Sequence, residues 1–279
     1  MIPGRVEILR ELARIGALHD AQIDLGEAAL LLAFMESPKA QLENYRVHLQ
    51  LLADETRAAM AMHPADTITV RAEVLHNVLV NHHHYRGDSL TYDDLQNANL
   101  IRVIDRRMGL PITLGILYLV VCHALGWEAE GLNFPGHFLV RLAKDADRMI
   151  IDPFHDGQEM DVPRLRHMLK AAAGMAAELT PDHYLPMSRR DILLRLENNI
   201  KLRLVQAGRL ELALKTVEVM QAIAPGEVSL WRDRGMLLAA QGELVSAIDA
   251  IQKFHDLSPD AKSKQQAQIL IQQLKRRLN

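Results

Sequence analysis

The chain of 279 residues is long enough for one large domain or two ordinary ones, each with a buried core. Its 49% apolar and 24% charged residues are typical of a soluble globular protein, and a formal net charge of −3 gives no reason to expect nucleic acid or a membrane surface as a partner. The single cysteine, Cys122, excludes an internal disulfide and a cysteine-based metal site. With no signal-peptide pattern and no apolar run near the roughly 20 residues of a membrane span, we expect a cytoplasmic protein.

The first hundred residues carry helical patterns. Ser37-Pro38 is expected to start a helix as a cap followed by a first-turn proline. A second helix is expected to begin at Asp66 or Thr67, residues 81–88 are expected to form a loop, and a third helix is expected over about residues 93–108. The buried face of the first helix is marked by apolar residues at helical spacing: Leu42, Tyr45, Leu49 and Leu52.

The middle of the chain predicts a long apolar helix followed by a hairpin. The stretch from Gly109 to Thr113 is expected to open the helix, which runs to Leu125 and stops at Gly126. Two short apolar runs, residues 138–142 and 149–151, flank a charged turn and predict two antiparallel strands. His137 begins the first strand and Asp152 ends the second, so the hairpin can bring the two side chains together.

A thiol enzyme needs a thiolate at a helix N-terminus, a histidine that exchanges its proton, and a carboxylate that orients the histidine. His137 and Asp152 could supply the last two groups. The only thiol, Cys122, lies eleven residues into the expected helix, roughly 16 Å along its axis, and we expect it to be a buried apolar residue. The sequence therefore predicts a His–Asp pair without its thiol.

The last ninety residues contain an internal repeat with a period of about 34 residues, which is that of a tetratricopeptide unit. We expect two units over residues 187–279, closed by a capping helix over about 261–278, and an N-terminal domain over residues 1–186 made of a helical lead-in (1–108) and a core (109–186). Two units are fewer than such arrays usually need, so we expect them to pack on their own N-terminal domain. The matched positions are Gly208 and Gly242, Ala213 and Ala247, Pro225 and Pro259, Leu204 and Leu238, and Leu210 and Leu244.

Three motifs resemble the SirB family of bacterial proteins, which have a transglutaminase-like domain and a tetratricopeptide tail. The resemblance implies an α+β fold with a cysteine-protease-like core. In active transglutaminase-like enzymes a Gly-x-Cys opens the helix, and counting back from its closing Leu-Gly puts Pro111 at the cysteine position, while His137 and Asp152 match the family's His and Asp. The resemblance thus implies a pseudoenzyme. The motifs are Arg107-Met108-Gly109-Leu110-Pro111-Ile112-Thr113-Leu114, Phe134-Pro135-Gly136-His137-Phe138-Leu139-Val140 and Ile151-Asp152-Pro153-Phe154.

Other interpretations of these residues stay open. Thr113 carries a hydroxyl in the first helical turn, where it could serve as a nucleophile or bond to backbone groups. His137 and Asp152 could be a satisfied structural pair or the remains of a ligand-binding cleft. The residues expected to line such a cleft are Pro111, Asn133, Phe134, Gly136 and Phe154.

The run His82-His83-His84, with Asp88 and His155 as additions, raises the alternative of a metal site. Adjacent histidines on a helix point in different directions, so we expect a solvated helix end and no metal or other cofactor.

In the repeats, the inner helices are too apolar to bind the C-terminal carboxylate of a partner, as some tetratricopeptide domains do. They suit contact with an apolar helix. Their inner positions are Arg195, Asn198, Leu202 and Val205 in the first unit and Ser229, Arg232, Met236 and Ala239 in the second.

The leading hypothesis is a non-catalytic transglutaminase-like protein that binds a protein or peptide and could have a regulatory role. The alternative is a hydrolase or acyltransferase that uses His137 and Asp152 with Thr113 or an activated water.

Overall fold

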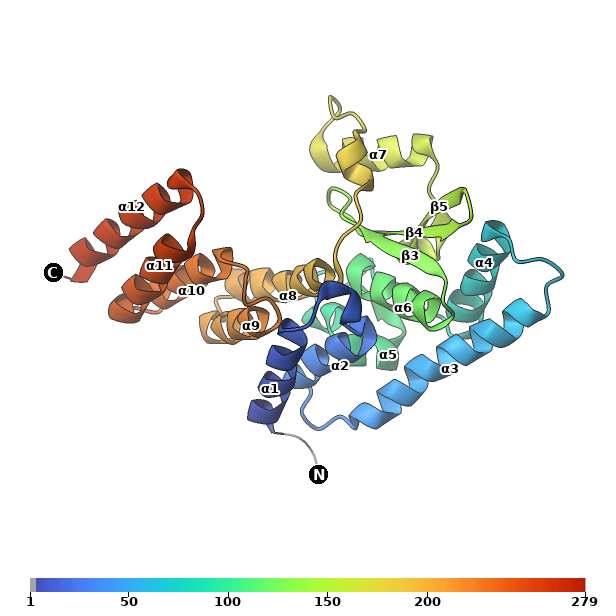
Figure 1. Ribbon diagram of the computed structural model, residues 1–279, viewed down its shortest axis with the longest axis horizontal. Coiled ribbons are helices and arrows are strands. Elements are labelled where there is room, and N and C mark those ends of the chain that lie inside the picture. The colour runs from blue at the N-terminus through green and yellow to red at the C-terminus, as the bar shows by residue number, and fades with distance from the viewer. Residues whose placement is uncertain (1–3, 279) are drawn as a thin grey trace. The chain divides into compact units, whose positions relative to one another are not determined.

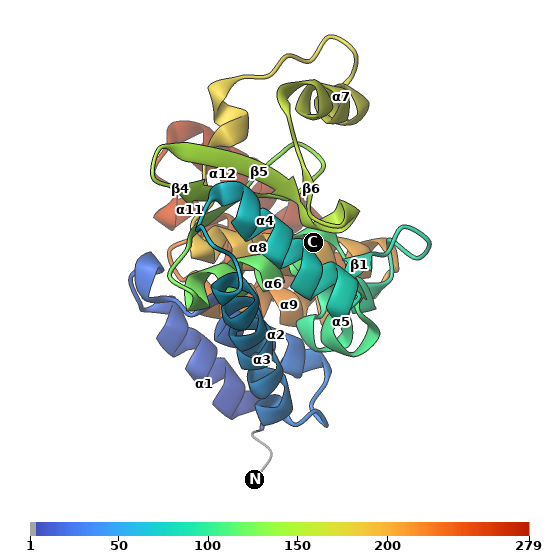
Figure 2. The same cartoon turned by 90° about the vertical axis from the view of Figure 1, so that its right-hand side faces the viewer.

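The computed structural model describes residues 4–278. Outside it lie residue 279 and residues 1–3, which belong to the N-terminal stretch that showed no signal-peptide pattern. The chain forms two compact units (Figures 1 and 2). Among the described residues, 4 and 20–196 make up the first unit, and 5–19 join 197–278 in the second. The boundary expected at residue 186 stays a prediction. No helix in the described part of the chain has the length and apolar content that a membrane span requires.

The first unit begins with three helices: α2 (Leu25–Glu36), α3 (Leu42–Ala61) and α4 (Ile68–Leu75). The prediction that Thr67 starts a helix is confirmed, because its hydroxyl accepts a hydrogen bond from the Val70 amide at 3.2 Å. The expected start at Ser37-Pro38 is wrong. Ser37 ends α2 through a hydrogen bond from its amide to the Phe34 carbonyl, and a turn closed by Ala40 contains the proline.

The segment before the apolar helix differs from the expected loop and helix. A π-helix (His76–His82, η2) extends α4 into the expected loop, and short strands β1 (Arg86–Gly87) and β2 (Met108–Gly109) pair in parallel. The expected helix over 93–108 is divided into a 3-10 turn (Leu95–Ala98, η3) and α5 (Leu100–Arg106). Asn99 divides them because its extended backbone leaves the helix while its side chain caps α5.

The apolar helix α6 (Pro111–Ala124) lies in contact with a four-stranded antiparallel sheet (Figure 1). The predicted hairpin is β4 and β5, and the outer strands β3 and β6 were not predicted. Gly115 permits the contact, since a Cβ there would overlap the ring of Phe138. A 3-10 turn, η4 (Pro153–His155), connects the third and fourth strands, and α7 (Val162–Ala173) and η5 (Pro181–Tyr184) follow the sheet in the chain. The strands are β3 (Glu128–Leu132), β4 (Leu139–Lys144), β5 (Asp147–Asp152) and β6 (Gln158–Glu159).

The second unit is entirely helical in its described residues. Gly208 and Gly242 adopt φ angles of +69° and +84° in the turns where the repeat predicted them. The N-terminal helix α1 packs on α9, where Gly16 is required because a Cβ would overlap the Ala222 carbonyl oxygen. The helices are α1 (Arg5–Gly16), the later part of α8 (Arg189–Gln206), α9 (Leu210–Ile223), α10 (Ser229–Ala240), α11 (Leu244–Leu257) and α12 (Ala261–Leu278).

Candidate functional site

The structure brings His137 and Asp152 into direct contact. Asp152 is the last residue of β5, and His137 lies in a turn two residues before β4, so the β4–β5 pairing places them side by side. His137 Nε2 lies 2.8 Å from Asp152 Oδ1. The carboxylate is fully buried, whereas 12% of the histidine side chain is exposed. The buried Asp152 carboxylate therefore orients the His137 ring at the edge of a packed hairpin.

His155, which was considered above only as an addition to the histidine run 82–84, is a third member of the His137–Asp152 cluster. Its Nδ1 lies 2.7 Å from Asp152 Oδ2, and the Phe154 amide donates to Oδ1 at 2.9 Å. The rings of His137 and His155 stack at 5.8 Å, and the Phe154 ring meets His137 edge-on. The sequence did contain a signal for His155, namely Asp-Pro-Phe-His at the end of the second predicted strand. An aspartate that caps a 3-10 turn lies beside the side chain three positions later, which here is His155.

Opposing effects act on the Asp152 carboxyl. Burial raises its pKa, but hydrogen bonds and charge interactions with His137 and His155 outweigh burial and leave the pKa below its usual value. Asp152 is therefore ionised at neutral pH and serves as an acceptor for both rings. Among the described residues, His137 Nδ1 has no hydrogen-bond partner, so this nitrogen is the one that could face a ligand.

Arg195 holds the backbone of the His137 turn. Its guanidinium donates to the His137 carbonyl at 2.5 Å and to Asn133 Oδ1, and it lies over the Phe138 ring at 5.6 Å. Its position in the repeat predicted Arg195 on an inner helix of the first repeat unit, and it does lie on α8. Its hydrogen bonds also place its guanidinium beside the His–Asp pair.

The start of α6 offers no thiol. Pro111 is buried at its first position, where a missing N–H removes no intrahelical hydrogen bond. Thr113 is fully buried and donates its hydroxyl to the Asn97 carbonyl at 2.8 Å, in place of the expected bond to backbone amides. Cys122 is also fully buried, and burial raises the pKa of its thiol to about 12. The thiol is thus protonated and shielded.

The five residues expected to line a cleft occupy different environments. Phe134 is 1% exposed and belongs to an apolar cluster with Leu139 and Leu165, whereas Asn133 and Gly136 are exposed. Phe154 lines a pocket of about 570 Å³. His155 and Gly157 line the same pocket, so it adjoins the carboxylate cluster.

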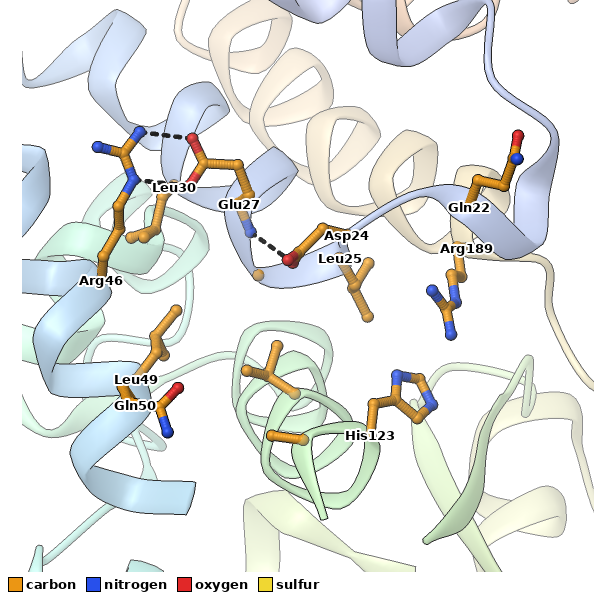
Figure 3. A pocket seen from close by; sticks show the side chains of 13 residues that line it. Gln22, Asp24, Leu25, Glu27, Leu30, Arg46, Leu49, Gln50, His123 and Arg189 are labelled. Atoms are coloured by element: carbon orange, nitrogen blue, oxygen red, sulfur yellow. Dashed lines mark hydrogen bonds and ion pairs between the residues drawn. The ribbon is translucent and has the colours of Figure 1, made fainter. Parts of the chain in front are cut away.

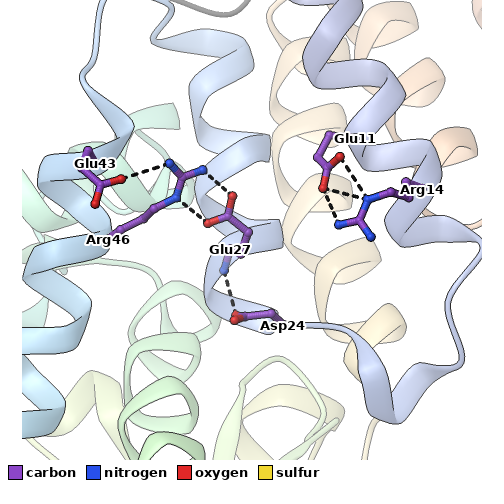
Figure 4. Close-up of polar contacts among 6 residues, drawn as sticks. All are labelled: Glu11, Arg14, Asp24, Glu27, Glu43 and Arg46. Carbon is purple, nitrogen blue, oxygen red and sulfur yellow. Dashed lines mark hydrogen bonds and ion pairs between the residues drawn. The ribbon is translucent and has the colours of Figure 1, made fainter.

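A second pocket, of about 550 Å³, was not predicted (Figure 3). It lies beside the C-terminal end of α6, about 20 Å along that helix from Pro111. Its main charges are already engaged: Arg46 binds both oxygens of Glu27, and Asp24 caps α2 (Figure 4). These contacts favour a structural role for its polar groups. In the other unit, Arg14 and Glu11 form a separate pair within α1, drawn in the same figure.

Two groups of histidines and carboxylates within residues 4–278 could hold a metal ion. One is His137, Asp152 and His155, and the other is Glu55, His82 and His83. In each group the donor atoms lie within 4.8 Å of one another.

Comparisons with known proteins match both parts of the chain. Residues 43–198 match the transglutaminase-like superfamily, and residues 200–274 match the tetratricopeptide repeat. A UPF0162 protein of Vibrio cholerae is 31% identical over 77% of this chain and 79% of its own length, and one of Xylella fastidiosa (strain Temecula1) is 27% identical over 88% of each. A solved structure of menin is 12% identical, with a TM-score of 0.39, and the match covers 94% of this chain and 72% of that one. The predicted order of a transglutaminase-like domain and tetratricopeptide repeats is confirmed.

Proposed function

This chain belongs to the transglutaminase-like superfamily. We propose that it functions by binding a protein or peptide segment and not by thiol catalysis. The observation that carries the proposal is the start of α6, where a buried proline occupies the position expected for the nucleophile. Cys122 cannot replace it, because its thiol is fully buried far along the helix. Without a thiolate, the His137–Asp152 pair cannot form an acyl-thioester intermediate.

The tetratricopeptide repeats support a binding role. Leu202, Val205 and Met236 on α8 and α10 are 50%, 40% and 49% exposed. A Lys201–Asp233 ion pair joins the two helices. Val205 lies one helical turn from Lys201, and Met236 lies one turn from Asp233, so both apolar side chains flank the ion pair. A patch of this kind fits the apolar face of a partner helix.

The binding proposal can be tested with peptides selected from a display library on the full-length chain. Met236→Glu places a charge in the patch and is expected to weaken the binding of the selected peptides by about tenfold or more. Val245→Glu is the matched control, since Val245 is 61% exposed on α11 and not on the two helices that carry the patch. Equal binding by both variants would argue against this surface.

A hydrolase or acyltransferase is the alternative, and the assembled His137–Asp152 contact is the observation that favours it. An activated water could be deprotonated by His137 Nδ1, and Asp152 would stabilise the imidazolium that forms. Hydrolysis of ester or thioester substrates that disappears in His137→Ala would support this alternative. The cytoplasmic location, a regulatory role and the packing of the repeats on the N-terminal domain remain predictions.

A further inference from the structure

Glu55, His82 and His83 converge on one point of the first unit. His83 Nε2 lies 2.6 Å from Glu55 Oε2, and His82 Nδ1 lies 3.2 Å from the same oxygen. The two imidazole rings are 4.7 Å apart. Adjacent histidines were expected to diverge, so this convergence differs from the sequence-based expectation.

The backbone explains the convergence. Successive side chains of an α-helix diverge by about 100°, but the turns of a π-helix are wider and the angle is smaller. Here His82 ends the π-helix, and the His83 amide donates to Val78 five residues earlier at 2.9 Å. His84 then leaves the helix with φ of +60°. The widened turn directs both rings toward α3, which carries Glu55.

The three side chains are mounted on packed elements. Leu52 on α3 and Leu79 on the π-helix are fully buried, which fixes the spacing between the two helices. The ring of His48, two turns before Glu55 on α3, meets His83 edge-on at 5.5 Å. His48 is held in turn by a 2.8 Å hydrogen bond with the Tyr85 hydroxyl.

We propose that Glu55, His82 and His83 form a binding site for one transition-metal dication, with zinc as the ion that the donors suit best. Two imidazole nitrogens and one carboxylate oxygen are a common zinc donor set, and a fourth position would remain for water or a ligand. At zinc–ligand distances of about 2.0–2.2 Å, two ligands of a tetrahedral site lie about 3.4 Å apart. The separations of 2.6 and 3.2 Å to Oε2 need only a small opening to reach that value.

The other histidine cluster is arranged less favourably for a shared ion. His137 and His155 contact different oxygens of Asp152, and the Phe154 amide occupies one of them as well. In the Glu55 cluster both imidazoles face a single oxygen, while 67% of the His82 side chain is exposed and leaves a path for the ion.

The test is a zinc titration by calorimetry on the metal-stripped full-length chain, purified with a tag that lacks histidine. We expect one ion per chain and at least a tenfold loss of affinity in Glu55→Gln and His83→Gln, as for loss of a zinc ligand. Cobalt in place of zinc should give the absorption of a tetrahedral site, and this absorption should be lost in the same variants.

His155→Ala is the matched control and is expected to bind zinc like the parent chain. Should Glu55→Gln or His83→Gln fail to fold, His82→Ala removes a mostly exposed ligand and is expected to show the same loss. An absence of zinc binding in the parent chain would overturn the proposal. So would binding that survives all three substitutions at the Glu55 cluster or that is lost only in His155→Ala.

Discussion

Replacement of Asp152 by alanine is expected to destabilise the first unit by about 3 to 5 kcal/mol, the usual effect of removing one partner from a buried charged pair. The carboxylate accepts hydrogen bonds from His137, His155 and the Phe154 amide, and it is fully buried. Its loss leaves the His137 ring and the Phe154 amide without their acceptor, at about 1–3 kcal/mol each. His155 contributes less because 58% of its side chain is exposed.

Asp152→Asn separates charge from shape. The amide keeps one oxygen acceptor, so we expect a loss of about 1–3 kcal/mol at neutral pH. Because the pKa of Asp152 is lowered in the folded state, its charge stabilises the fold at pH values above the unfolded-state pKa of about 3.9. That stabilisation is lost as the pH falls through the folded-state pKa. The difference in stability between the parent chain and Asp152→Asn should therefore shrink in acid.

Urea unfolding followed by tryptophan fluorescence measures both effects. Trp127 lies in the first unit with Asp152, and Trp231 lies in the second, so a Trp231→Phe background leaves one reporter for the first unit. A loss below about 1 kcal/mol in Asp152→Ala would show that this cluster does not stabilise the hairpin.

Three further predictions concern packing and the thiol. Gly115→Ala should lower the stability of the first unit by about 1–3 kcal/mol, because the added methyl group overlaps the Phe138 ring; an unchanged urea midpoint would contradict it. Gly16→Ala should destabilise the second unit, followed by Trp231 in a Trp127→Phe background, since the α1–α9 contact has no room for a Cβ; a parent-like transition would refute this. Iodoacetamide should alkylate Cys122 in urea but not in the native chain, by intact mass, because burial keeps its thiol protonated; rapid native labelling would show that the helix opens.

The β4–β5 hairpin and the repeats could be predicted because their signals are local. Two apolar runs around a charged turn define the hairpin, and that pairing carries His137 to Asp152. The 34-residue period marks Gly208 and Gly242, whose positive φ angles end their helices. In both cases the structure could be predicted because it depends on residues that are close in sequence or that recur at a fixed period.

Other features depend on backbone geometry or distant contacts, which side-chain patterns do not reveal. The π-helix before His83 leaves no mark in the apolar pattern, so its two histidines were expected to diverge. The place of α1 beside α9 depends on the Gly16–Ala222 approach, more than 200 residues apart in sequence. Arg195 was assigned to the repeat groove because its helix position matched, whereas its contacts lie at the His137 turn.

The most direct test of the central claim is the intact mass of the full-length chain after incubation with ester, thioester and glutamine-peptide acyl donors. We expect no covalent adduct, and turnover no greater than that of His137→Ala and Thr113→Ala. An acyl adduct that is lost in Thr113→Ala, or turnover that requires His137, would show that this site does perform acyl-transfer chemistry.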